Sequence, residues 1–122
     1  MAKELKRIKV DAVCILSTET KEKSSAVHSR FFAPNYGINE DPVTGSANGP
    51  LGCYLYKYVI PAGYKVAFRE LTDGRIEFVG EQGDEIQRIG RIKIRLRALE
   101  KNIENISIAG EATTIMDAKI KI

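Results

Sequence analysis

At residues 40–52 the chain reads Glu40-Asp41-Pro42-Val43-Thr44-Gly45-Ser46-Ala47-Asn48-Gly49-Pro50-Leu51-Gly52. This stretch joins a carboxylate, a glycine turn and the start of an apolar helix. Asp41 precedes a proline, which pushes its backbone toward an extended conformation, and Gly45 permits the turn that must follow. From about Ser46 the apolar residues keep the spacing of one helical face: Ala47, Leu51, Tyr54, Leu55, Tyr58 and Val59. The stretch therefore predicts an extended segment, a tight loop and a helix in succession.

The start of this helix has two interpretations. The first amides of a helix have no acceptor within it and lie at the positive end of its dipole, so they favour a bound carboxylate or phosphate. Gly45 would let such a ligand come close. Alternatively, Asp41 and Thr44 satisfy those amides themselves, as ordinary helix caps. Residue types alone leave both interpretations open.

Length and charge set broad limits. A chain of 122 residues is long enough for one domain, and we expect a single domain over residues 1–122. The net charge of +3 is small and its lysines and arginines are interspersed with acidic residues. This pattern favours neither nucleic acid nor an anionic membrane, but small anionic molecules fit it. No apolar run is long enough to span a bilayer, and residues 1–7 are not followed by a signal-peptide core. We expect a cytoplasmic protein.

The metal-binding and nucleophilic residue types are sparse. Cys14 and Cys53 stand far apart, each in an apolar stretch, which favours buried free thiols over a disulfide. His28 is the single histidine and has no partner motif nearby, so a structural role is favoured over a catalytic one. No CxxC motif or histidine pair is present, and the sequence predicts no metal site.

Strand patterns occupy most of the remaining chain. Alternating or β-branched stretches predict strands at 8–16, 28–33, 65–71, 75–79, 91–99, 106–109 and 113–122. The turn Thr72-Asp73-Gly74 predicts a hairpin. The other faces of the helix carry small residues, Gly49, Gly52 and Cys53. The helix is therefore apolar nearly all round and is predicted to be buried. We therefore expect an α+β domain whose mostly antiparallel, barrel-like sheet curves around one central helix, with the anion-binding end of the helix at one rim.

Two motifs now identify a family. The segments Ser29-Arg30-Phe31-Phe32-Ala33-Pro34 and Gly37-Ile38-Asn39-Glu40-Asp41-Pro42-Val43-Thr44-Gly45-Ser46-Ala47-Asn48 closely resemble the signature of the carboxyl-terminal half of PhzF-like proteins, the phenazine-biosynthesis isomerase family. Glu81-Gln82-Gly83, Arg88-Ile89-Gly90 and Ile108-Ala109-Gly110-Glu111-Ala112 extend the resemblance over essentially the whole chain. It implies the diaminopimelate-epimerase-like fold, in which two similar halves enclose an active site.

The resemblance also implies a chemistry. It is cofactor-independent proton transfer at carbon, without metal, flavin or pyridoxal phosphate. Asp41 matches the family's active-site aspartate, and Thr44, Gly45 and Ser46 match the loop that holds the carboxylate of the substrate. The acid/base glutamate and the Gly-His-Pro loop of the family belong to the amino-terminal half, and nothing in this sequence matches them. Asp41 alone lacks the opposing group that proton transfer across a carbon centre requires.

Three interpretations follow from the missing group. The chain could be one half of a split isomerase whose amino-terminal half is encoded separately, or a homodimer in which two copies imitate the full-length molecule. It could also be a truncated gene product without activity of its own. Association is favoured, because the surface that faces the other half should be partly apolar. A hot-dog acyl-binding fold is a more remote alternative, since its acidic residue normally lies on or near the helix rather than before it.

Overall fold

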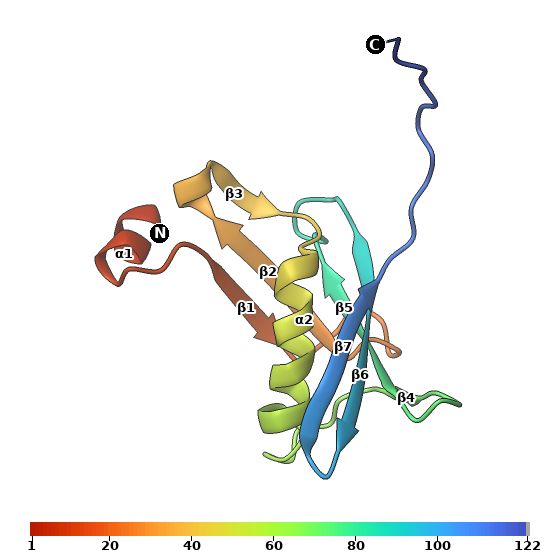
Figure 1. The fold of residues 1–122 in the computed structure, drawn as a ribbon. Coiled ribbons are helices and arrows are strands. Elements are labelled where there is room, and N and C mark those ends of the chain that lie inside the picture. The colour runs from red at the N-terminus through yellow and green to blue at the C-terminus, as the bar shows by residue number, and fades with distance from the viewer. Residues whose placement is uncertain (122) are drawn as a thin grey trace.

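The computed structural model describes residues 1–121 (Figure 1). In chain order its elements are α1 (Ala2–Arg7), β1 (Val13–Ser17), β2 (Val27–Ala33), the 3-10 turn η1 (Pro34–Tyr36), β3 (Ile38–Asp41), α2 (Gly45–Tyr54), the π-helical continuation η2 (Leu55–Val59), β4 (Arg69–Glu70), β5 (Ile76–Gln82), β6 (Gly90–Leu99) and β7 (Asn102–Ala109).

The strands form one seven-stranded sheet in the order β1-β2-β5-β6-β7, with β3 paired to β2 and β4 paired to β5. Every pairing is antiparallel except β2 with β5, which is parallel. Figure 1 shows an open sheet, with α2 lying along one of its faces. The α+β fold class predicted from the sequence, with a mostly antiparallel sheet and few helices, is confirmed.

Strand β6 shows how the sequence positions the helix. Its residues alternate between the two faces, and Ile92, Ile94 and Leu96 are buried on the face that α2 covers. Leu51 and Leu55 of the helical segment pack with Ile92 and Ile94 in one apolar core, together with Val27 of β2 and Phe78 of β5. Gly52 lets the helix approach the sheet, because a β-carbon there would overlap the side chain of Ile94.

The outward face of the helical segment departs from the prediction. The helix is not buried all round, since Tyr54 is 47 % exposed and Tyr58 61 % exposed. The two rings instead contact one another at a centroid distance of 5.4 Å. Tyrosine accounts for the difference, because its ring can cover the helix while its hydroxyl faces water.

Several element boundaries also differ from the predictions. The strand predicted at 8–16 is confined to β1, because residues 8–12 form the turn and connection that follow α1, with Lys9 at φ 57°. The strand predicted at 65–71 shrinks to β4, although the hairpin turn with Gly74 at φ 78° is present.

The strand predicted at 113–122 is wrong for residues 113–121, which extend from β7 without forming a strand, and Ile122 lies outside the described residues. Within residues 1–121 no helix is long and apolar enough to cross a membrane.

Candidate functional site

The four site residues predicted from the sequence meet at one end of α2. Asp41 is the last residue of β3, Thr44 is the N-cap of α2, and Gly45 and Ser46 form the first turn of the helix. Asp41 is held in place on the other side by its pairing with Phe31 of β2. The loop between β3 and α2 thus connects a sheet strand directly to a helix N-terminus.

Neither Asp41 nor Thr44 caps the helix with its side chain. The hydroxyl of Thr44 donates a hydrogen bond to the Asp41 carboxylate, and no cap bond is made by the Thr44 side chain. The amides of Ala47 and Asn48 bond to the carbonyl of Thr44. Within residues 1–121 the amides of Gly45 and Ser46 find no acceptor. The capping interpretation is therefore wrong, and two donors remain free at the positive end of the helix.

A buried glutamine, which sequence reasoning did not select, holds this loop. Gln82 lies at the end of β5 and is almost fully buried. Its Nε2 donates to the backbone oxygen of Asp41 at 2.7 Å and to Thr44 Oγ1 at 2.9 Å. Its Oε1 accepts from the Thr44 amide at 3.2 Å and from Asn48 Nδ2 at 3.1 Å. Gln82 therefore fixes both the residue that carries the carboxylate and the residue that begins the helix.

Glycines allow β5 to lie against the loop. Gly83 has φ 84°, and a β-carbon there would come within 2.6 Å of the Pro42 carbonyl and would also overlap the carbonyl of Arg88. A β-carbon at Gly45 would lie 2.7 Å from Ile108 of β7. Both positions require glycine for close approach, which explains two of the glycines in the motifs of the sequence.

The loop is partly open to solvent. Asp41 is half-buried, whereas Ser46 is exposed. A hollow of about 520 Å³ touches the same loop through Val43 and reaches Gly90 and Arg91 of β6. The loop is thus accessible to a ligand.

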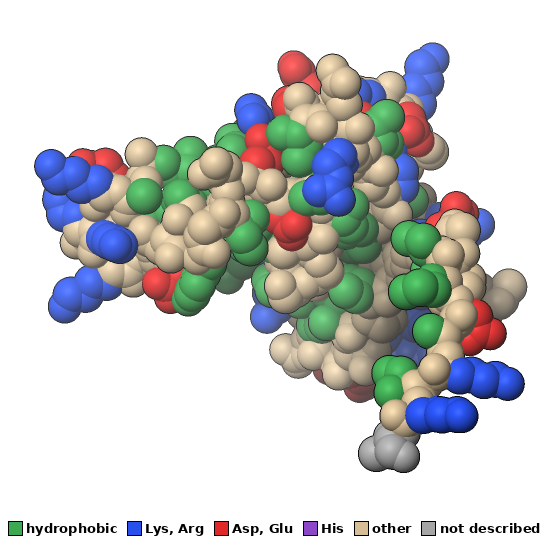
Figure 2. Space-filling model, turned by 90° about the horizontal axis from the view of Figure 1, so that it is seen from above, with side chains coloured by type: hydrophobic (Ala, Val, Ile, Leu, Met, Phe, Trp, Pro, Cys, Tyr) green, Lys and Arg blue, Asp and Glu red, His purple; other side chains and the backbone are tan. Residues whose placement is uncertain are grey.

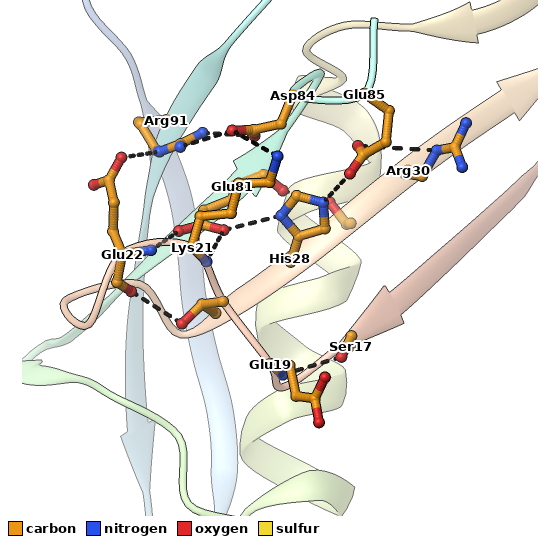
Figure 3. Close-up of polar contacts among 12 residues, drawn as sticks. Ser17, Glu19, Lys21, Glu22, His28, Arg30, Glu81, Asp84, Glu85 and Arg91 are labelled. Atoms are coloured by element: carbon orange, nitrogen blue, oxygen red, sulfur yellow. Dashed lines mark hydrogen bonds and ion pairs between the residues drawn. The ribbon is translucent and has the colours of Figure 1, made fainter.

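His28 belongs to a separate polar cluster on the outer face of the sheet (Figure 3). Its Nδ1 and Nε2 lie 2.9 Å from carboxylate oxygens of Glu81 and Glu85, respectively. Glu81 is fully buried, and its carboxylate also accepts hydrogen bonds from the backbone amides of Lys21 at 2.9 Å and Glu22 at 2.8 Å. The cluster therefore attaches the loop between β1 and β2 to β5.

Electrostatics in this cluster favour the charged forms. Burial alone would raise the pKa of Glu81, but the amides of Lys21 and Glu22 and the His28 ring outweigh it and lower that pKa to about 2. Burial alone would lower the pKa of His28, but its hydrogen bonds to Glu81 and Glu85 raise it overall. The contacts of His28 are consistent with the structural role expected from the sequence.

The cysteines are free, as predicted, but only half-buried. Burial raises the pKa of the Cys14 thiol, which keeps it protonated at neutral pH. Across the part of the chain that the structure describes, no group of three or more histidine, cysteine or acidic side chains is arranged to hold a metal ion.

The structure is an α+β domain in which an aspartate lies beside free amides at the start of α2, in a loop that is partly exposed. A family model for phenazine biosynthesis-like proteins, PhzC-PhzF, matches residues 1–118. The chain belongs to this family.

Similar proteins agree with that assignment. An uncharacterized isomerase of Clostridium acetobutylicum is 32 % identical over 98 % of this chain and 37 % of its own length. The trans-2,3-dihydro-3-hydroxyanthranilate isomerase of Pseudomonas aeruginosa is 29 % identical over 75 % of the chain and 29 % of its own length. The crystal structure of a PhzF-family protein of Bacillus anthracis matches with a TM-score of 0.67 at 32 % identity, covering 87 % of this chain and 33 % of that one. The chain thus spans about a third of the length of these relatives.

Proposed function

We propose that the chain forms one wall of the active site of a PhzF-like, cofactor-independent isomerase. The observation that carries this proposal is the pair of free amides at Gly45 and Ser46 beside a carboxylate that Thr44 orients. The substrate is a small molecule with a carboxylate, which the two amides and the Ser46 hydroxyl bind at the positive end of the helix dipole. Asp41 is the catalytic residue.

Thr44 acts through Asp41 in this proposal. Its hydroxyl donates to the Asp41 carboxylate and its amide donates to Gln82, so both of its donors are already used. This arrangement keeps the Asp41 carboxylate in one orientation and leaves the ligand to Gly45 and Ser46. Thr44 is therefore a positioning residue of the anion site.

The reaction is the movement of one proton between two carbons. Asp41 removes a proton from one carbon of the substrate, the electron pair shifts along the conjugated system, and an acid on the opposite wall delivers a proton to another carbon. Proton and charge balance without an oxidant or a further reactant. Such catalysis needs two groups on opposite sides of the substrate. We propose that a second half, either a separate amino-terminal-half protein or a second copy of this chain, supplies the other group.

An assay of proton exchange tests this function. The chain is mixed, in D2O, with a fragment containing the part of the Clostridium acetobutylicum relative that it does not match. The probe substrate is trans-2,3-dihydro-3-hydroxyanthranilate, the compound in the name of the Pseudomonas relative. We expect deuterium to enter the substrate with the mixture and not with the chain alone. Asp41→Asn should slow it by at least about 100-fold, the usual contribution of an acid/base group.

The matched control is Asp73→Asn, in the hairpin turn between β4 and β5, which should exchange at the wild-type rate. If Asp41→Asn also exchanges at that rate, Asp41 is not the catalytic residue. A second candidate function, a homodimeric carboxylate-binding protein without catalysis, is favoured by the same free amides. It predicts carboxylate binding without deuterium incorporation in any mixture.

A further inference from the structure

The segment 113–121 has the sequence of a strand but no partner strand among the residues that the structure describes. Met116, Ala118 and Ile120 alternate with charged residues, yet within residues 1–121 this segment pairs with no other strand. Ile115, Met116 and Ile120 are 95 %, 80 % and 88 % exposed. Figure 1 shows this tail running away from the sheet beyond β7, and Figure 2 shows hydrophobic side chains uncovered along it. An isolated amphipathic strand is stable only when a sheet pairs its backbone and covers its apolar face.

The same chain offers a free sheet edge. Strands β1 and β7 are the two ends of the strand order, and β1 pairs only with β2 among the described strands. The outward edge of β1 therefore presents unpaired backbone donors and acceptors over five residues. Ile15 and Leu16 of β1 are exposed large apolar residues. An edge of this kind is the usual acceptor for an added strand.

The register of β1 shows to which side of the sheet an added strand would turn its apolar face. Leu16 lies opposite Ser29 in the β1–β2 register, and Ser29 shares its strand face with Val27 of the core. Leu16 therefore points to the side of the sheet on which α2 packs, where Tyr54 and Tyr58 remain exposed. A strand added beside β1 would turn one of its faces to this side, and Met116, Ala118 and Ile120 provide an apolar face.

We propose that the tail of one copy of this chain adds as a strand to the free edge of β1 in a second copy, and that the exchange is reciprocal. A tail leaves its own chain from β7, at the opposite end of the strand order from β1 (Figure 1). Each chain carries one such tail and one β1 edge, so a two-fold dimer uses both tails and both β1 edges. This assembly does not depend on the proposed isomerase chemistry.

Two alanine-to-proline substitutions in the tail test the exchange. Proline removes a backbone donor and is excluded from the middle of a sheet, so Ala118→Pro should block strand addition. Ala112→Pro, outside the alternating residues, is the matched control. Both positions are exposed and should leave the circular dichroism of the folded body unchanged. By light scattering, wild type and Ala112→Pro should be dimers and Ala118→Pro a monomer. A monomeric wild type or a dimeric Ala118→Pro overturns the proposal.

Disulfide trapping identifies the edge that receives the tail. The acceptor carries Cys53→Ser and keeps Cys14 of β1, and the donor carries Cys14→Ser, Cys53→Ser and Met116→Cys. Oxidation of the mixture should link donor to acceptor by a disulfide. The yield of linked dimer should be much lower when the donor cysteine replaces Asp117 instead of Met116. A single chain that carries Cys53→Ser and Met116→Cys and keeps Cys14 should form disulfide-linked dimers on oxidation. An internal disulfide in a monomer would show that the tail folds onto its own β1, and would refute exchange between copies.

Discussion

The hydroxyl of Thr44 donates to the carboxylate of Asp41, three residues before it, and accepts from Nε2 of Gln82 at 2.9 Å. One side chain therefore connects the end of β3, the start of α2 and the end of β5. Because the hydroxyl is used in this way, it does not cap the helix, and the amides of Gly45 and Ser46 stay free. The proposed anion site depends on this choice of partner.

Replacing Thr44 by valine removes that hydroxyl and keeps the shape of the side chain. We expect Thr44→Val to lower the free energy of unfolding by about 1–3 kcal/mol, because Gln82 Nε2 and the Asp41 carboxylate both lose a partner. Thr44→Ser keeps the hydroxyl and should cost only about 1 kcal/mol, the value of a buried methyl group. Urea denaturation measures both. Equal losses in the two variants would show that the hydroxyl contributes nothing to stability.

Replacing Gln82 by leucine tests the residue that holds the loop. Gln82→Leu leaves the backbone oxygen of Asp41, the Thr44 amide and Asn48 Nδ2 without this partner. We expect a loss of at least about 2 kcal/mol in unfolding free energy. Hydrogen exchange of the Thr44 amide should also become faster. The control Asn105→Leu, on the exposed part of β7, should stay within about 0.5 kcal/mol of wild type. An unchanged Thr44 exchange rate would contradict the role given to Gln82.

The glycines near the loop predict opposite effects of the same substitution. Gly83→Ala combines a positive φ with overlap onto two backbone carbonyls, and we expect destabilisation by more than about 2 kcal/mol. Gly49→Ala adds a β-carbon that meets nothing within 4 Å and improves helix propensity. It should stabilise the protein by up to about 1 kcal/mol. Thermal unfolding of the two variants distinguishes them, and a stabilising Gly83→Ala would refute the close packing of β5 on the loop.

His28 predicts a pH dependence near neutrality. Its pKa is raised in the folded protein, so protonated His28 contributes stability that is fully present below its unfolded pKa of about 6.5 and is lost as the pH rises through the folded pKa. His28→Gln should therefore cost about 1–3 kcal/mol at pH 6 and much less at pH 9. Because the chain has a single histidine, no other imidazole obscures this change. A cost that does not vary between these pH values would contradict the ion pairs with Glu81 and Glu85.

Glu81 predicts the acid limit of stability. Its folded pKa of about 2 lies below the value of 4.5 usual for glutamate, so its contribution is present above pH 4.5 and is lost as the pH falls toward 2. Glu81→Gln removes the negative charge of the carboxylate that is hydrogen-bonded to two backbone amides and to the His28 ring. The wild type should be more stable than Glu81→Gln above pH 5, with the gap closing toward pH 2. Acid denaturation curves that run parallel would refute this.

Local patterns predicted the parts of the fold that depend on local chemistry. The alternation of apolar and charged residues predicted β6 close to its observed position. The proline and glycine within residues 41–45 predicted the loop and the start of α2 equally closely. The tail at 113–121 alternates equally well and is not a strand, because a strand also needs a partner, which no pattern within one segment reveals.

Long-range contacts explain what was missed in the site. The role of Gln82 depends on partners 34 to 41 residues away along the chain, and His28 reaches Glu81 across 53 residues. The sequence predicted that Asp41, Thr44, Gly45 and Ser46 share one loop, but not whether Thr44 caps the helix. Only the position of Gln82 beside Thr44 shows why the hydroxyl turns to Asp41.

The amide resonances of Gly45 and Ser46 test the central claim most directly. In a titration of the isotope-labelled chain with benzoate, followed by NMR at constant ionic strength, these two amides should shift downfield and saturate. The amides of Gly37 and Gly74, in turns away from α2, should not move. Sodium chloride in place of benzoate is the control for ionic strength. Shifts that are absent at Gly45 and Ser46, or equal at all four glycine and serine amides, would contradict a carboxylate site beside Asp41.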